Sequence, residues 1–473
     1  MPWAIVFLFC WCAVLLDPQR LILGTDFGDM AELTLSAWAG GVPHSPGYPL
    51  WTHLAEWAIA LQPNTEPLHA VARMGVLMVC VAAALTLSFL RSLGVGAWAA
   101  TGAAGLVFVV PLCMRAYSIP EVLALDLLLV ATGLWAIERG DQSGKSGWTA
   151  LGVAIVILSV GHRPINVILF AVIAVGWQGI RRRSRGLLIG LVAGGVLQLV
   201  LYLDLWRRIH DPSTLWVDEY ALTTFKGFVR FVSGLTHDKF FVWAGGSEAI
   251  PRRPIALGLQ VYGLVSAAVL APILVRPRRL GWAFFVLSLW HLVFISVYQI
   301  ADRDFLFLPV LWVGVLTVAL MTKRIRDPLR GYAEKSLLAS VLILSIFNYR
   351  GVVRADQEPW QASLRDLLSS VPENAVILSD DWPKRTGLVA IRELEGVGPN
   401  VDVVRVGLQG GDIQNVEAWF RGESSLIQLE ERKEISELRP VRVQDSRLVP
   451  LLVERGLVVV PAEAGTWSVT TAP

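Results

Sequence analysis

The feature that most constrains this chain is a series of apolar segments, most of them about as long as a bilayer is thick. A helix needs about 20 apolar residues to cross the hydrocarbon core. Charged residues make up only 17% of the chain, whereas a soluble domain has about one quarter. The pattern therefore predicts a polytopic α-helical membrane protein with eleven transmembrane helices. The predicted helices lie near 3–23, 68–90, 95–113, 120–137, 148–160, 164–180, 186–203, 255–275, 280–299, 305–321 and 336–350.

The first segment also has the apolar core of a signal peptide. It lacks a basic stretch before residues 3–16 and a small-residue cleavage site after them. We therefore interpret it as a retained first helix.

The positive charges predict how these helices are oriented. If the N-terminus is cytoplasmic, every compact basic cluster between helices falls on the cytoplasmic side, as the positive-inside rule requires. The short loops and the lack of glycosylation sequons favour a bacterial plasma (inner) membrane. The clusters contain Arg91, Arg139, Lys145, Arg181, Arg182, Arg183, Arg185, Arg276, Arg278, Arg279, Lys323, Arg324, Arg326, Arg330 and Lys335.

The extracytoplasmic side then receives the polar parts of the chain. These are a first loop at 24–67, a long loop at 204–254 and the C-terminal region 351–473, which is too polar to span a membrane. We therefore predict a transmembrane domain over 1–350, followed by an extracytoplasmic domain over 351–473.

The C-terminal region has the pattern of a small α/β domain. Residues 374–380 and 401–407 are typical of strands, and 385–397 is typical of an amphipathic helix. A strand, a helix and a second strand within about 35 residues indicate a small α/β domain.

The first loop carries three carboxylates directly after the first apolar segment. Asp29 and Glu32 are three residues apart in a helix-compatible run, which puts both on one helical face. Such a pair can act as acid and base or bind a metal; it can equally be the solvated start of a helix, where acids suit the dipole. We interpret Asp26 as an N-cap.

The same loop continues with HSPGYPL at 44–50. Its two prolines and its glycine predict a turn. His44, at the entrance to the turn, is a candidate for substrate binding, although a single loop histidine is more often structural.

Further charged residues lie at the predicted outer ends of other helices. An arginine binds phosphate oxygens in bidentate fashion, so Arg163 is a candidate ligand for a lipid phosphate, with snorkelling to the interface as the alternative. Asp126 lies deeper and is expected to face the bundle. The candidates are Arg115 and Glu121, His162 and Arg163 in the polar break GHRPIN, and Asp302 and Arg303.

These motifs resemble those of a known family. GDMAEL followed by HSPGYPL is similar to the GDSGEL…HPPGYPL signature of an integral-membrane glycosyltransferase family with the GT-C fold. That family contains protein O-mannosyltransferases, including the type that acts on plexins and the Met receptor. Ser45 replaces the first proline of the second motif. Weaker similarities follow in the same order at 120–126, 161–166, 211–219, 302–309 and 374–382.

The resemblance implies that a sugar, mannose in that family, is moved from a polyprenyl-phosphate donor to an acceptor hydroxyl on the extracytoplasmic face. It implies inversion at the anomeric carbon, with Asp29 as general base and Glu32 orienting or assisting the acceptor. His44 and Tyr48 match the turn motif and would bind substrate. Arg163, with His162 or Arg115, would hold the phosphate.

Cofactor and partner expectations follow from the same reading. No cofactor is required; a divalent metal beside Asp29 and Glu32 is an option. The expected partners are the bilayer, the lipid-linked donor and a protein or glycan acceptor. A net charge of +2 gives no reason to expect nucleic acid.

Other functions fit the membrane pattern less well. A transporter is expected to have internal repeats and midplane binding residues, neither of which is visible here. A membrane-anchored adhesion or scaffold protein would not need eleven helices. A cell-envelope polysaccharide ligase or polymerase differs only in donor and acceptor. The chain has no P-loop, HExxH or CxxC motif.

Overall fold

The computed structural model describes most of the chain. Its first predicted helix, near 3–23, and Asp26 lie outside the described residues. The described residues are 27–110, 114, 117, 119–177, 184–211, 213–214, 224–235, 259–298, 307–353, 359–379, 382–406, 410–428, 433–435, 439–444, 446–455, 457–462 and 466–471.

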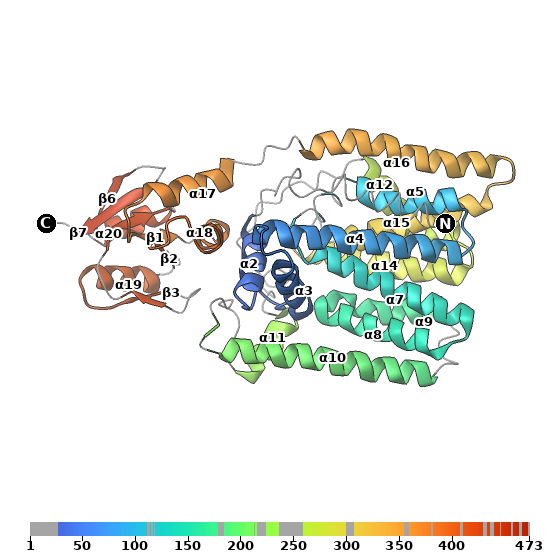
Figure 1. Ribbon diagram of the computed structural model, residues 1–473, viewed down its shortest axis with the longest axis horizontal. Coiled ribbons are helices and arrows are strands. Elements are labelled where there is room, and N and C mark those ends of the chain that lie inside the picture. Colours follow the sequence, from blue (N-terminus) through green and yellow to red (C-terminus); the bar gives the residue numbers. More distant parts are fainter. Residues whose placement is uncertain are drawn as a thin grey trace.

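The other ten predicted apolar segments all contain helix, and these helices run side by side in one long bundle (Figure 1). By length and composition, three of the described helices, α4, α10 and α14, could each cross a membrane. The bundle elements are α4 (Pro67–Ser92), α5 (Ala97–Val109), α7 (Leu123–Ser143), α8 (Ser146–His162), η1 (Pro164–Val167), α9 (Ile168–Gly176), α10 (Ser184–His210), α12 (Leu259–Val269), α13 (Ala271–Leu274), α14 (Arg278–Val297), α15 (Leu308–Met321), η6 (Thr322–Arg324) and α16 (Leu329–Val353).

Helix α10 has the two faces expected at a lipid boundary. One face packs on α8 through Gly186, Gly190 and Gly194, where an added Cβ would meet α8 backbone atoms at 2.5–2.9 Å. Small residues let membrane helices approach this closely. The other face exposes leucine and valine side chains such as Leu188 and Val192.

Short helices cover one end of the bundle, on the side of the C-terminal region (Figure 1). They are α2 (Phe27–Trp38), α3 (Pro49–Ala60) and α11 (Phe225–Val232). The segment predicted as a first loop, 24–67, therefore contains two helices. The long loop also begins later than predicted, because α10 continues to His210. Asp204 and Arg208 are bonded one turn apart in that extension, which stabilises it.

The C-terminal region folds as an α/β unit, and its predicted strand, helix and strand are confirmed as β1, α18 and β2. A five-stranded sheet has the order β2-β1-β5-β7-β6, parallel across β2, β1 and β5 and antiparallel beyond. Strands β3 and β4 form a separate antiparallel pair. The elements are α17 (Pro359–Ser370), β1 (Val376–Ser379), α18 (Trp382–Glu395), β2 (Asp402–Arg405), α19 (Gly410–Phe420), β3 (Leu426–Gln428), β4 (Lys433–Ile435), β5 (Val441–Val443), α20 (Leu448–Glu454), β6 (Leu457–Pro461) and β7 (Trp467–Thr471).

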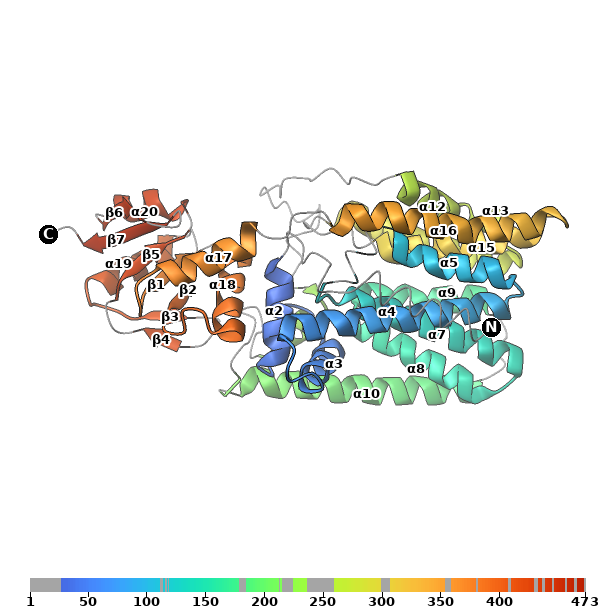
Figure 2. The same ribbon diagram turned by 45° about the horizontal axis from the view of Figure 1, so that its top comes forward.

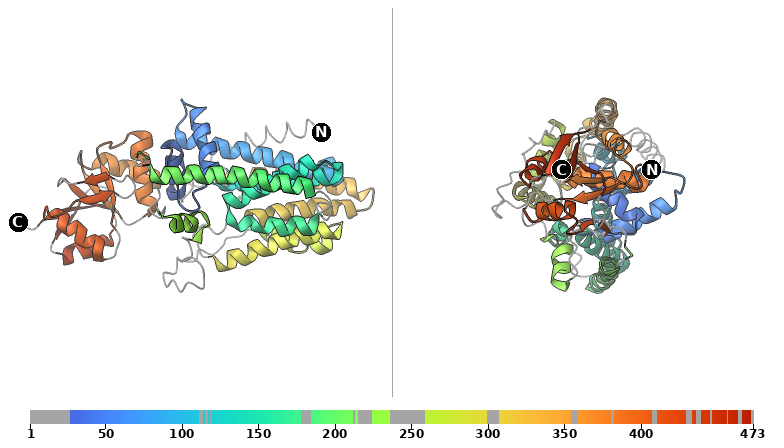
Figure 3. Two further views of the ribbon diagram at one scale, coloured as in Figure 1. Left: turned by 90° about the horizontal axis from the view of Figure 1, so that it is seen from below. Right: turned by 90° about the vertical axis from the view of Figure 1, so that its left-hand side faces the viewer.

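Helix α18 joins the C-terminal unit to the bundle. It packs against α2, and the two helices lie side by side in both views (Figures 1 and 2). Thr386 and Ala390, one turn apart on α18, are 0% and 2% exposed. Every α2 residue from Met30 to Ala37 is buried as well. One apolar core runs from the bundle through α2 into α18 and β1. Seen from below, the two parts lie end to end (Figure 3, left).

Candidate functional site

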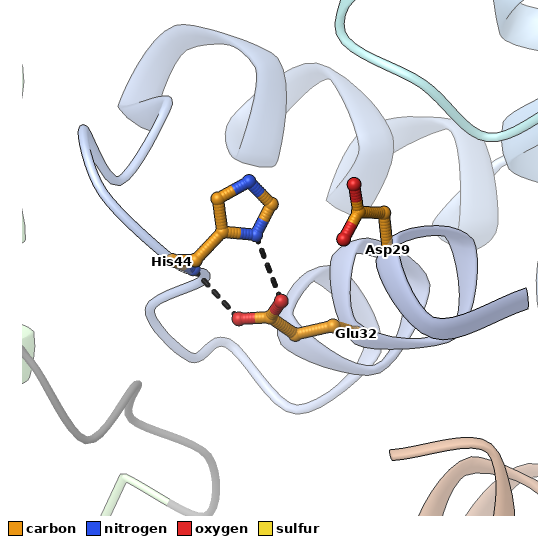
Figure 4. Close-up of side chains that lie close together, drawn as sticks. All are labelled: Asp29, Glu32 and His44. Carbon is orange, nitrogen blue, oxygen red and sulfur yellow. Dashed lines mark hydrogen bonds and ion pairs between the residues drawn. The ribbon is translucent and has the colours of Figure 1, made fainter. Parts of the chain in front are cut away.

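Asp29 and Glu32 lie one turn apart on α2, as their spacing predicts. Glu32 is completely buried, and its carboxylate accepts two hydrogen bonds from His44. The His44 backbone N–H donates to Oε1 over 2.7 Å, and Nδ1 lies 2.8 Å from Oε2. Figure 4 shows Asp29 beside this pair, on the open side of the imidazole. Glu32 therefore fixes the position of His44, while Asp29 stays partly exposed.

The turn that carries His44 is held from behind by α10 and α11. The Gly47 N–H donates to the His44 carbonyl over 2.8 Å, and the Ser45–Pro46 peptide bond is cis. Ser45 Oγ donates to the Phe231 carbonyl over 2.5 Å. Gly47 has φ +82°, and a Cβ there would lie 2.8 Å from Leu205. Only glycine fits this conformation and this space.

Tyr48, in the same motif, contacts both His44 and His162, the last residue of α8. Its ring meets those of His44 and His162 edge to face, each at 5.5 Å between centroids. Burial raises the pKa of the Tyr48 phenol well above its usual value. The phenol therefore stays protonated at every physiological pH and can act as a hydrogen-bond donor.

Glu121 lies just before α7 and brings a second carboxylate near Asp29. Its backbone carbonyl accepts a hydrogen bond from Trp51 Nε1 over 3.1 Å, which ties it to α3. Burial and the nearby Asp29 carboxylate raise the pKa of Glu121 to about 7. Like charges at close range disfavour each other's ionised form. Glu121 therefore keeps its proton to a higher pH than an ordinary glutamate does.

The break GHRPIN is a junction between two helices. Pro164 disfavours helical geometry at Arg163, whose backbone is extended (φ −138°, ψ 110°). The chain then forms the single turn η1, and Asn166 Nδ2 donates back to Ser159 Oγ over 2.8 Å. His162 Nε2 donates to the Val122 carbonyl over 3.0 Å.

This junction surrounds Asp126 on α7, which is 2% exposed. Arg163 Nη1 donates to its Oδ2 over 3.0 Å, and Asn166 Nδ2 donates to its Oδ1 over 2.5 Å. Asp126 thus faces the bundle and is paired, as expected from its depth.

A second charged cluster lies behind the turn, between α3 and the end of α10. Arg208 bonds to Asp204 and to both oxygens of Glu56, and His53 lies between the two acids. His53, Asp204 and Arg208 line a small pocket with Gly41 and Pro49. The hydrogen bonds to Arg208 and His53 lower the pKa of Glu56.

The structure brings seven of the predicted candidates to one end of the bundle. Arg115, Asp302 and Arg303 lie outside the described residues. The seven are Asp29, Glu32, His44, Tyr48, Glu121, His162 and Arg163.

Two residues that sequence reasoning missed share this region. Tyr298 lies within electrostatic range of Asp29 and Arg163. Asn166 holds Asp126. The signal for Asn166 was its place in the polar break, three residues after Arg163. No pattern marks Tyr298, because a single tyrosine at a helix end is common at membrane interfaces.

The donor set near Asp29 fits a divalent cation. Among the described residues, Asp29, Glu32 and His44 form a group whose potential ligand atoms lie within 4.8 Å of one another. A metal-binding histidine usually donates its other ring N–H to a carboxylate, and Glu32 stands in that position to Nδ1.

No family model matches the chain, and no curated protein matches it by sequence. Solved structures do match. ArnT from Cupriavidus metallidurans, bound to undecaprenyl phosphate, superposes over 100% of this chain and 98% of its own, with a TM-score of 0.64 and 13% identity. Its apo form matches over 99% of both chains, with a TM-score of 0.58 and 13% identity.

The Archaeoglobus fulgidus oligosaccharyltransferase, solved with Zn and sulfate, matches over 99% of this chain and 73% of its own, with a TM-score of 0.57 and 12% identity. The chain has the GT-C fold. This confirms the predicted fold class, a polytopic helical membrane protein with a small C-terminal α/β unit.

Proposed function

We propose that the protein is a membrane glycosyltransferase that moves a sugar from a polyprenyl-phosphate donor to an acceptor hydroxyl. The observation that carries the proposal is the site itself. A partly exposed carboxylate, Asp29, lies beside the hydrogen-bonded Glu32–His44 pair. The charges of Asp29 and of Arg163 both act on Tyr48 and on Tyr298. A base and a phosphate-binding cation are the two groups that this reaction needs.

In the proposed reaction, the acceptor oxygen attacks the anomeric carbon from the side opposite the phosphate. The acceptor proton passes to Asp29 as the new C–O bond forms. The bond between the anomeric carbon and the phosphate oxygen breaks, and its electron pair leaves with the polyprenyl phosphate. Base catalysis of this kind contributes about 10²–10⁴-fold. The sugar is inverted, because attack and departure occur on opposite faces.

We assign Glu32 to positioning, because both of its oxygens are engaged by His44. His44 and Tyr48 then line the acceptor side, and the protonated Tyr48 phenol donates to a sugar or phosphate oxygen. Arg163 compensates the charge that develops on the leaving phosphate. Positioned donors of this kind stabilise a transition state without reorganising during the reaction.

A divalent cation, if the enzyme uses one, would be held by Asp29 and His44, with Glu32 orienting the imidazole. When bound, it would supply charge stabilisation for the leaving phosphate or acidify the acceptor hydroxyl. His44 and Asp29 would then orient the acceptor through the same side chains.

The comparisons support the donor class. ArnT was solved with undecaprenyl phosphate bound, and the present chain matches it over its whole length. The motif resemblance favours mannose as the sugar and leaves a protein or a glycan as the acceptor. A transporter is less well supported, because the ionisable groups described above gather at one end of the bundle rather than at its middle.

The function is tested in cells by comparing the hydroxyl-linked sugars of the envelope with and without the gene, using mass spectrometry. We expect one linkage to disappear and to return with the wild-type gene. An unchanged envelope, together with no sugar release by the purified protein from a panel of polyprenyl-phosphate sugars, would contradict the proposal.

A further inference from the structure

Arg163 is a nearly buried cation with a single fixed contact. Its side chain is 15% exposed, and Asp126 is its only hydrogen-bond partner within the described part of the chain. That bond uses Nη1, so Nε and Nη2 donate to no described residue. A buried guanidinium is costly unless its donors are satisfied. The unused donors are suited to an anionic ligand.

Asp126, the carboxylate that pairs with Arg163, is fixed by a further hydrogen bond from Asn166. Asp126 is 2% exposed in the first turn of α7, and its second oxygen accepts from Asn166 Nδ2. The same Asn166 amide contacts Ser159 Oγ and the Ser159 carbonyl. Each oxygen of Asp126 thus has its own donor, one from Arg163 and one from the η1 turn.

We propose that Asp126, held by Asn166, is a positioning residue that directs Nε and Nη2 of Arg163, which donate to no described residue, toward the phosphate of the lipid-linked donor. Asp126 itself does not touch the donor. This inference rests on the proposed function, because it takes the phosphate ligand from it. It gives a role to Asp126, five residues after Glu121, which the sequence analysis expected only to face the bundle.

The substitution Asp126→Asn tests whether Asp126 orients Arg163 or only contributes charge and volume beside it. Asp126→Asn keeps the shape but has one oxygen and one NH₂ group, so it can accept from Arg163 or from Asn166 but not from both. If only net charge mattered, losing a carboxylate beside Arg163 would strengthen phosphate binding. If aim matters, binding weakens.

The probe is undecaprenyl phosphate, and the measurement is its dissociation constant for purified protein in nanodiscs. We expect Arg163→Ala to weaken binding by about 30-fold or more and Asp126→Asn by about 5–10-fold. The double variant should bind no more weakly than Arg163→Ala alone, because Asp126 acts only through Arg163. Asn166→Ala should give a smaller loss in the same direction.

Glu138→Gln is the matched control. Glu138 is also a buried carboxylate on α7, bonded to Trp177 and Gln142, and lies twelve residues further along the helix. It should leave the dissociation constant unchanged. Melting temperatures with and without the probe show whether each variant is folded; if Asp126→Asn is not, Asn166→Ala carries the test.

The possible results distinguish the positioning role of Asp126 from the proposed class of donor. Wild-type or tighter binding by folded Asp126→Asn would overturn the positioning role, as would a double variant in which the two losses multiply. Wild-type binding by Asn166→Ala would overturn it if that variant carries the test. Failure of the wild-type protein to bind the probe would instead contradict the proposed donor class.

Discussion

At the scale of single residues, the site is a set of charges whose states depend on one another. Asp29 and Glu121 come from different elements, yet the Asp29 charge is one of the causes that raise the Glu121 pKa to about 7. Glu32 is engaged differently, because both of its oxygens form hydrogen bonds with His44. We therefore assign the acceptor proton to Asp29 rather than to Glu121, because the raised pKa of Glu121 favours its protonated form.

The raised pKa of Glu121 predicts a pH-dependent stability. In the unfolded chain the carboxyl titrates near 4.5, and in the folded protein near 7. Between these values the folded state holds a proton that the unfolded state has released, so stability falls as pH rises through this window. We expect the melting temperature to fall less between pH 5 and 8 in Glu121→Gln than in wild type. Identical slopes would mean that Glu121 titrates normally.

The sequence was enough to predict the motif residues of the site, but only some of the residues that contact them. Asp29, Glu32 and His44 were visible because their spacing within one short loop limits where they can lie. Asn166 and Tyr298 could not be placed, because their contacts with α7 and with the Asp29 region depend on how distant helices pack. Sequence spacing carries no information on such contacts.

At the scale of elements, α10 and α11 support the turn HSPGYPL through packing and a hydrogen bond to Ser45. Leu205 and Ile209 on the extended end of α10 pack with Phe228 and Phe231 of α11 around Val42. The extension was predicted as loop because its charged residues interrupt the apolar run. The pairing of Asp204 with Arg208, four residues apart, was the overlooked sign of helix.

Arg208 is predicted to matter for stability rather than for chemistry. It is 12% exposed and joins Asp204 on α10 to Glu56 on α3. Arg208→Ala removes the cation that joins these two partly buried carboxylates, so we expect a loss of about 1–3 kcal/mol, measured as a lower melting temperature.

The neighbouring Arg207 supplies the control for this prediction. It also pairs with Asp204, but its side chain is 71% exposed. Arg207→Ala should cost at most about 1 kcal/mol, as exposed pairs do. Equal losses from the two substitutions would show that the cluster does not join α3 to α10.

At the scale of the whole molecule, the C-terminal unit and the site share one end of the bundle (Figure 2). Helix α18 packs against α2, the helix that carries Asp29 and Glu32. The apolar runs predicted the bundle helices, and alternation predicted β1 and β2. The α18–α2 contact was not predictable, because it joins segments more than 300 residues apart.

This arrangement predicts the membrane topology when combined with the positive-inside rule. Glu454 is exposed in the C-terminal unit, and Lys335 is exposed in α16, in a predicted cytoplasmic cluster. In intact cells, a membrane-impermeant maleimide should label Glu454→Cys at once and Lys335→Cys only after permeabilisation. The reverse order would place the site on the cytoplasmic face and contradict the proposed reaction.

The central claim is that Asp29 is the base of a sugar transfer, and turnover of the purified Asp29→Asn variant tests it most directly. The assay measures release of polyprenyl phosphate from the polyprenyl-phosphate sugar that the wild-type protein uses. Asp366→Asn, an exposed position on α17, is the matched control and should retain wild-type turnover. We predict that Asp29→Asn remains folded and loses about 10²–10⁴-fold in turnover. Turnover close to that of the wild type would contradict the account.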